Sequence, residues 1–135
     1  MIHHLSLGTN DVARARRFYE AAFPVIGLHL MQDKETELIY EAGTFLVSPI
    51  MPINGHPAMA GNRSHIAFAA EDRGMVHRFH AAALANGGTD DGAPGLRPEY
   101  DANDYGAFVR DRDGNKIEAV TSSAKGAGKP RRPWC

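Results

Sequence analysis

The sequence has a single cysteine, Cys135, so no disulfide can form within the chain, and this usage is typical of a reducing compartment. No apolar run approaches the roughly 20 residues that cross a bilayer, and the first residues lack the features of a secretory signal. Neither charge sign dominates, because 15 basic and 16 acidic residues leave a net charge of −1. We therefore expect a cytoplasmic protein that binds neither membranes nor nucleic acid.

The chain has the composition of an ordinary globular domain. Of its 135 residues, 43% are hydrophobic and 23% are charged, which excludes a disordered or fibrous protein. Residues 122–135 differ from the rest, since they combine glycines and prolines with four basic residues and no acid. We expect a single domain over residues 1–121 and a flexible basic tail over residues 122–135.

The domain contains an internal repeat. Residues 4–23 align without a gap on residues 65–84, and each copy starts with an alternating run, continues with an aspartate suited to cap a helix, and ends in a helical pattern. The identical pairs are His4/His65, Asp11/Asp72, Arg17/Arg78, Phe18/Phe79, Ala21/Ala82 and Ala22/Ala83.

Three extended segments follow each predicted helix. In the first half they cover about 28–32, 35–41 and 44–49, and in the second half 88–91, 105–111 and 115–121, of which 88–91 has the weakest pattern. Each half therefore reads strand–helix–strand–strand–strand, with module one over about 1–50, a connector over 51–63 and module two over 64–121. This order predicts an α+β protein built from paired βαβββ modules.

Two histidines and a carboxylate are predicted on the sheet faces that the helices leave open. His4 and His65 are equivalent in the repeat and point away from the helices, and Glu118 shares that orientation on the last strand. If the first strand is shifted by one residue, His3 replaces His4. Two imidazoles and one carboxylate suit a divalent Fe, Mn, Ni, Co or Zn ion with positions left for water and substrate. The residue pattern thus predicts a metal site.

The segments HHLSLGTNDVARARRFYEAAF, SHIAFAAED and FVRDRDGNKIEAV resemble the vicinal oxygen chelate superfamily, which includes glyoxalase I, extradiol dioxygenases and the fosfomycin and bleomycin resistance proteins. The resemblance covers about residues 1–121. It implies an eight-stranded cupped mixed sheet with the helices on its outer face, and metal ligands at His4, His65 and Glu118. It also implies a homodimer, in some members with modules exchanged between chains.

One position departs from the glyoxalase I pattern. That enzyme has a fourth ligand, a glutamate on the last strand of the first module, and the equivalent residue here is Val47, or Ser48 if the alignment slips by one. Glu37 and Glu41 are near in sequence but belong to another strand or turn, so neither is expected to replace it. The resemblance therefore implies a three-ligand site.

The expected function follows from this site. The resemblance implies a metal-dependent enzyme of the lyase (lactoylglutathione-lyase-like), isomerase or dioxygenase type, acting on a small substrate that chelates the metal through neighbouring oxygens. Arg97, Tyr100 and Tyr105 are candidates to bind that substrate, and the residues leave the catalytic base unassigned. The alternative is a non-catalytic, bleomycin-resistance-like protein that binds a small molecule, against which the three retained ligands argue.

Overall fold

The structure is a computed structural model that describes residues 1–123; residues 124–135, with most of the predicted basic tail, lie outside the described residues. Module one comprises β1 (His4–Gly8), α1 (Val12–Ala22), a short 3₁₀ helix (Pro24–Ile26), β2 (His29–Asp33), β3 (Leu38–Ala42) and β4 (Phe45–Ile50). Module two comprises β5 (His65–Ala69), α2 (Arg73–Ala85), β6 (Thr89–Leu96), β7 (Tyr105–Arg110) and β8 (Lys116–Thr121). Within residues 1–123 no helix has the length and apolarity to cross a membrane.

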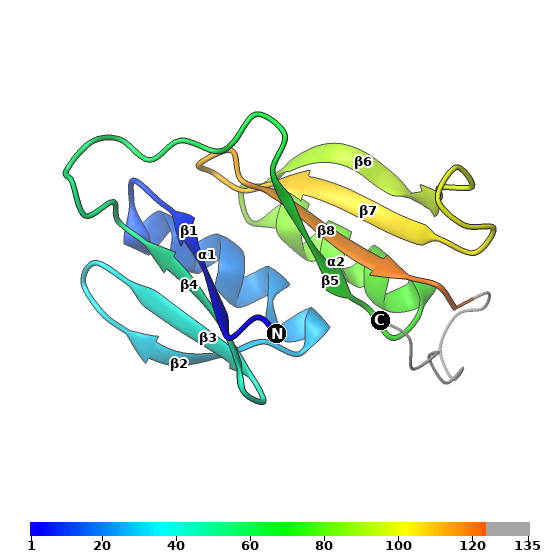
Figure 1. The fold of residues 1–135 in the computed structure, drawn as a ribbon, viewed down its shortest axis with the longest axis horizontal. Coiled ribbons are helices and arrows are strands. Elements are labelled where there is room, and N and C mark those ends of the chain that lie inside the picture. The colour runs from blue at the N-terminus through cyan, green and yellow to red at the C-terminus, as the bar shows by residue number, and fades with distance from the viewer. Residues whose placement is uncertain (124–135) are drawn as a thin grey trace.

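The two modules repeat one topology, which confirms the predicted fold. Their sheets have the strand orders β1-β4-β3-β2 and β5-β8-β7-β6, and in each the first strand runs parallel to the last while the other pairs are antiparallel. The sheets lie side by side in one chain with both helices behind them (Figure 1). The eight strands thus form two separate four-stranded sheets in the described part of one chain, with β1 and β5 at their edges.

The predicted aspartates start both helices. Asp11 accepts a hydrogen bond from the backbone of Arg14 at 3.0 Å, and Asp72 accepts one from the backbone of Met75 at 2.8 Å. Each carboxylate satisfies an N–H group that has no partner inside the helix. The buried positions follow the helical period as predicted, with Ala15, Phe18, Tyr19 and Ala22 in α1 and Val76, Phe79 and Ala83 in α2.

One hydrophobic core joins the modules on the helix side. Helices α1 and α2 contact each other, and the ring of Phe23 in module one packs edge-on against Phe68 of β5 with centroids 5.4 Å apart. The same buried cluster contains Val47 of β4 and Ile117 of β8. Since the helices cover only this side, the opposite face of each sheet remains open to solvent.

Strand β6 is longer than the weak pattern over 88–91 indicated. It extends to Leu96 through Gly92, Pro94 and Gly95, residues that are uncommon inside strands. Its pairing with β7 is irregular around Gly92, whose φ of 153° suits only glycine. The irregular register explains why period-2 alternation could not reveal the strand.

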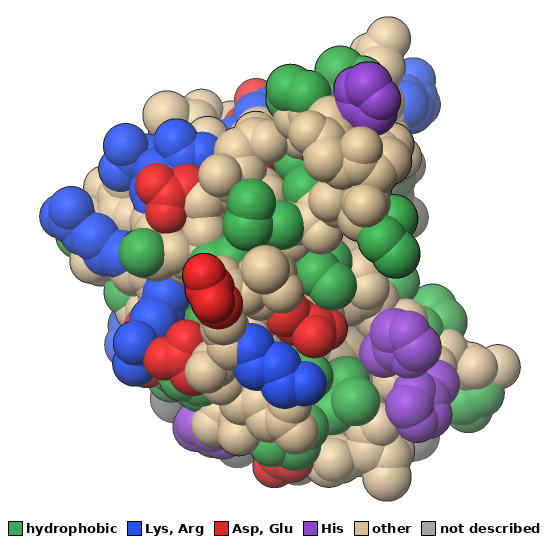
Figure 2. Space-filling view, turned by 90° about the vertical axis from the view of Figure 1, so that its left-hand side faces the viewer, with side chains coloured by type: hydrophobic (Ala, Val, Ile, Leu, Met, Phe, Trp, Pro, Cys, Tyr) green, Lys and Arg blue, Asp and Glu red, His purple; other side chains and the backbone are tan. Residues whose placement is uncertain are grey.

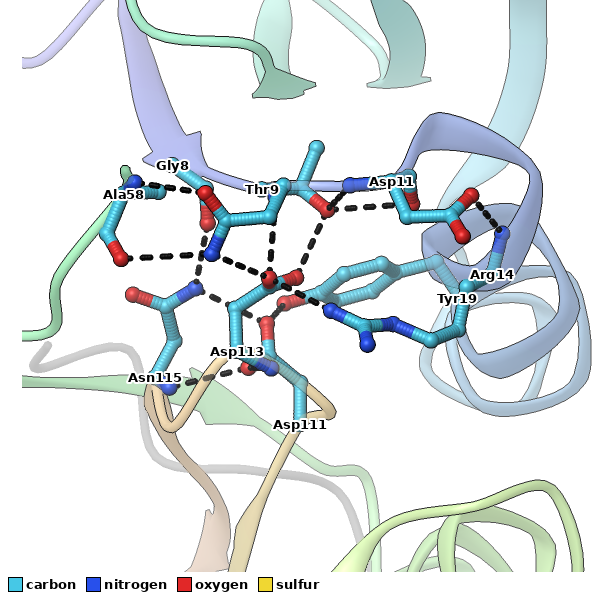
Figure 3. A network of polar contacts seen from close by, with 10 residues as sticks. Gly8, Thr9, Asp11, Arg14, Tyr19, Ala58, Asp111, Asp113 and Asn115 are labelled. Carbon is cyan, nitrogen blue, oxygen red and sulfur yellow. Dashed lines mark hydrogen bonds and ion pairs between the residues drawn. The ribbon is translucent and has the colours of Figure 1, made fainter. Parts of the chain in front are cut away.

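A polar network joins the β7–β8 turn of module two to the start of module one (Figure 3). Asp113 accepts hydrogen bonds from the Thr9 hydroxyl at 2.6 Å, the Asn10 backbone at 2.9 Å and the Arg14 guanidinium at 2.8 Å. Its side chain is only 2% exposed. The β7–β8 turn therefore joins the two modules through Asp113, and its first aspartate, Asp111, takes part in the same network.

Tyr19 and Asn115 complete this inter-module network. The Tyr19 hydroxyl donates to Asp111 at 2.5 Å, and the Asn115 amide donates to the Gly8 carbonyl at 3.0 Å. Burial, together with the Asp111 carboxylate, raises the pKa of Tyr19 well above its usual value, so the hydroxyl keeps the proton that it donates. The network therefore fixes β8, and with it Glu118, relative to module one.

Candidate functional site

The open faces of the two sheets carry small and polar side chains. Along β1, His4 and Ser6 are exposed while Leu7 is buried in the core; along β5, His65 and Ala67 are exposed while Ile66 packs toward the core. This alternation follows from the period of two in a strand. The orientation predicted for the two histidines is thus the one that the strands adopt.

His65 and Glu118 meet on the open face of the second sheet. His65 Nε2 lies 3.3 Å from Glu118 Oε1, and Glu118 is only 7% exposed although it belongs to an open face. The second oxygen, Oε2, lies over Gly106 of β7, where an added Cβ would approach it to 2.8 Å. The absence of a side chain at Gly106 therefore gives the carboxylate its space.

The surroundings of Glu118 favour a bound cation. Burial, and then the nearby Asp104 carboxylate, raise the pKa of Glu118 to about 7, and the positive charges of Arg97 and Lys116 offset only part of this effect. A buried carboxylate that lacks full compensation is stabilised by a cation. An imidazole nitrogen beside a carboxylate oxygen is a donor pair that suits divalent first-row metals. These two side chains fit such an ion.

Charged and aromatic side chains surround this pair. Lys116 Nζ lies 4.7 Å from the centre of the Phe108 ring, and the Arg97 guanidinium lies 5.6 Å from the same centre. Among the described residues, Asp104 Oδ1 is buried without a hydrogen-bond partner. The open face of the second sheet thus offers cationic groups and an aromatic surface to an anionic or planar ligand.

His4 lies apart from His65 and Glu118. A cleft of about 270 Å³ between the sheets is lined by Ser6 and Gly8 of β1 and by His65. His4 begins β1, and four residues of strand, about 13 Å, separate it from Gly8. In the described part of one chain, no group of three or more His, Cys, Asp or Glu side chains is close enough to hold a metal ion. One chain therefore brings together two of the three predicted ligands.

The N-terminal histidines occupy an exposed position. His3 Nδ1 and His4 Nδ1 lie 3.0 Å apart, and both residues are exposed. Figure 2 shows histidine side chains gathered at the lower right of the molecule, apart from the mixed acidic and basic side chains on the left. Strand β1 begins at His4, which shares its face with Ser6, so the register places His4 on the open face.

The three predicted substrate-binding residues occupy different surroundings. Arg97 lies on the Glu118 side, close enough for its charge to lower the pKa of that carboxyl group. Tyr100 is 73% exposed in the loop before β7. Tyr105 lies on the opposite face of β7, where its hydroxyl is 2.5 Å from His77 Nε2 and its ring lies under the Arg73 guanidinium. Only Arg97 is therefore beside the His65–Glu118 pair.

The strand register identifies the counterpart of Glu118 in module one. Glu118 pairs with Ala67, two residues after His65, and Ser48 pairs with Ser6, two residues after His4. The counterpart is thus Ser48, the alternative expected if the alignment slips by one, whereas Val47 is a core residue with no exposure. The Ser48 hydroxyl donates to Glu37 Oε2 at 2.8 Å. From the sequence, Glu37 was not expected to replace the missing ligand, because it is not on the last strand of its module.

Comparisons with known proteins agree with this architecture. A family model described as the Glyoxalase/Bleomycin resistance protein/Dioxygenase superfamily matches residues 1–119. A solved glyoxalase/bleomycin resistance protein from Albidiferax ferrireducens T118 is 36% identical, with a TM-score of 0.82 over 89% of this chain and 97% of that chain. The search of curated proteins gave no match.

Two more distant structures share the fold. Lactoylglutathione lyase from Agrobacterium tumefaciens is 19% identical, with a TM-score of 0.62 over 89% of this chain and 92% of that chain. The fosfomycin resistance protein FosX from Mesorhizobium loti is 19% identical, with a TM-score of 0.68 over 91% of this chain and 92% of that chain. At such identities the likeness concerns the fold.

Proposed function

The chain belongs to the glyoxalase/bleomycin resistance protein/dioxygenase superfamily, and we propose that it is a metal-dependent enzyme of the lyase, isomerase or dioxygenase type. Its substrate is a small molecule that chelates the ion through two neighbouring oxygens. The observation that carries this proposal is the His65–Glu118 pair. An imidazole nitrogen lies 3.3 Å from the oxygen of a buried carboxylate whose negative charge is only partly compensated by nearby cations.

The proposed ligands are His4, His65 and Glu118, and the ion is divalent Fe, Mn, Ni, Co or Zn. Since one chain leaves His4 apart from the other two, we propose that a second copy of the chain supplies it. Strands β1 and β5 are the edges of their sheets, and edge strands tend to pair with another chain. A homodimer that sets β1 of one copy beside β5 of the other brings His4 to the partner's site.

Different residues of the chain bind the metal ion and the substrate. When bound, the divalent ion stabilises negative charge that develops on the substrate oxygens. His65 and Glu118 hold that ion. Gly106 has no side chain and so leaves space for the Glu118 carboxylate. Arg97 binds an anionic group of the substrate and Phe108 offers its ring face to a planar part. The Phe108 ring, whose centre lies 5.6 Å from that of the His65 ring, also shields one side of the His65–Glu118 pair from water.

Metal dependence is tested by measuring the metal content of the purified protein by elemental analysis, followed by assays on small compounds with neighbouring oxygens, such as catechols and α-hydroxy ketones. We expect one divalent ion per site and turnover that is lost after chelation and restored by the ion. Tight binding of such compounds without turnover would instead support the non-catalytic binding protein. Absence of bound metal under all loading conditions would contradict the proposal.

Mixing two inactive variants tests whether the site is shared between chains. His4→Ala and His65→Ala homodimers each lack one ligand in both sites, so neither is expected to bind metal tightly. After unfolding and refolding together, random pairing gives one intact site in each mixed dimer, or about a quarter of all sites. We expect this fraction of wild-type metal binding by isothermal titration calorimetry. No recovery, with mixed dimers shown by mass spectrometry, would place all ligands within one chain.

A further inference from the structure

Module one has Ser48 where module two has Glu118, and a carboxylate from a neighbouring position accepts a hydrogen bond from this serine. We propose that Glu37 is this carboxylate and that it binds the same metal ion, so that the site contains His4, Glu37, His65 and Glu118. The proposal rests on the proposed metal-dependent function and adds a fourth ligand to it, drawn from a strand where the glyoxalase I pattern has none.

The strand register places Glu37 at a defined position of the repeat. In module two, Glu118 lies opposite Phe108, and Gly106, two residues earlier on β7, pairs with Val120. In module one, the pairing of Tyr40 with Val47 sets Ile39 opposite Ser48. Glu37, two residues earlier, bridges to Ile50 in the same antiparallel sense. Glu37 therefore occupies the position of Gly106.

The side chains at these diagonal positions are complementary between the modules. In module two, glutamate on the last strand extends over a glycine on the neighbouring strand, because Gly106 has no Cβ to collide with Glu118 Oε2. In module one, the last strand has the small Ser48 and the neighbouring strand position has Glu37. Each module thus has one carboxylate at this pair of positions, which is 48 and 37 in module one and 118 and 106 in module two. In module two the last strand carries it, and in module one the neighbouring position does.

The hydrogen bond from Ser48 fixes the carboxylate in this place. Ser48 is 6% exposed, and its hydroxyl donates to Glu37 Oε2 at 2.8 Å, which holds the carboxylate next to residue 48 of β4. One oxygen is thereby oriented, and the carboxylate can use its second oxygen for a cation. Ser48 acts as a positioning residue for Glu37.

The relation to the histidines is also repeated. His4 pairs with Leu46, two residues before Ser48, just as His65 pairs with Lys116, two residues before Glu118. Each open face therefore presents one imidazole and one carboxylate, and in both modules the imidazole lies two register positions before residue 48 or residue 118 of the last strand. In the proposed dimer the two faces would supply two imidazole nitrogens and two carboxylates, a donor set that suits a divalent first-row metal.

The test compares Glu37→Gln with Glu41→Gln. Glu41 is the matched control, because it lies on the same face of β3, opposite Leu46, and makes no hydrogen bond to Ser48. We expect Glu37→Gln to weaken Ni²⁺ binding about tenfold or more, measured by isothermal titration calorimetry, and Glu41→Gln to leave it unchanged. The absorption spectrum of the Co²⁺-loaded protein should change with Glu37→Gln alone, as expected for a lost ligand.

A relocated carboxylate provides the decisive variant. The double substitution Glu37→Gly with Ser48→Glu gives module one the arrangement of module two, and we expect it to restore Ni²⁺ affinity and the Co²⁺ spectrum. Wild-type affinity in Glu37→Gln, with affinity lost in Glu118→Gln, would overturn the inference and leave the proposed function standing. Absence of metal binding in the wild-type protein would overturn both. Thermal melts of each metal-free variant verify that it is folded.

Discussion

Replacing Asp113 with alanine is expected to lower the free energy of unfolding by about 3 kcal/mol, because the substitution removes a buried carboxylate that accepts hydrogen bonds from three donors, one of them a charged arginine that is one-third exposed. The Arg14 guanidinium, the Thr9 hydroxyl and the Asn10 backbone all donate to this one carboxylate. The Thr9 hydroxyl also contacts the Asp11 carbonyl at 3.1 Å, so the loss falls mainly on the Arg14 guanidinium and the Asn10 N–H. Urea denaturation of the metal-free protein measures the loss.

The matched control for Asp113 is Asp33, which also pairs with an arginine of α1. Asp33 Oδ2 lies 2.7 Å from Arg16 Nη1, but these side chains are 40% and 48% exposed. Exposed ion pairs contribute about 0–1 kcal/mol, so Asp33→Ala is expected to have at most that effect. Equal destabilisation by the two substitutions would show that the inter-module network has no special role in stability.

Glu118→Gln is expected to lower stability in the presence of metal but not in its absence. In the metal-free protein it removes a buried carboxylate whose pKa is raised to about 7, so we expect stability to be unchanged or to rise by about 1 kcal/mol. With metal at about 1,000 times its Kd, the wild-type protein gains about 4 kcal/mol. A 100-fold weaker site gains only about 1.4 kcal/mol. Thermal melts with and without Mn²⁺ or Ni²⁺ measure both effects.

A second glutamate serves as the control for this experiment. Glu99 lies in the loop before β7 and is exposed, so Glu99→Gln is expected to retain the full metal-induced stabilisation. If Glu118→Gln retained it too, Glu118 would not be a ligand, and the function proposed from the His65–Glu118 pair would lose its support.

Local patterns predicted the fold because each element carries its own signals. Asp11 and Asp72 cap helices through contacts with residues three positions ahead, and the apolar period of α1 is visible within a few turns. The repeat then supplied the topology, since two copies of one unit fold alike. The orientations of His65 and Glu118 followed from strand alternation, which is also a local property.

The features that escaped prediction depend on contacts between distant or diagonal positions. Whether Val47 or Ser48 corresponds to Glu118 depends on strand pairing, and a slip of one residue reverses the face of every side chain. Glu37 bridges to Ile50 and reaches Ser48 diagonally, two residues away on β4, a contact that alignment of equivalent positions does not reveal. Tyr105 was expected beside the ligand site but lies toward α2, because it shares the helix-facing side of β7 with the buried Ala107 and Val109.

The inter-module network has a consequence for the order in which the protein folds during its synthesis. Thr9 and Asp113 are 104 positions apart, so the first turn of α1 lacks its carboxylate partner until almost the whole described chain has been made. At about 5–20 residues per second, a ribosome takes roughly 5–20 s to add that length. During this interval the nascent first module exposes the hydrophobic surface around Phe23 that β5 later covers. Chaperones that bind apolar segments therefore have their longest opportunity on the N-terminal half of the chain.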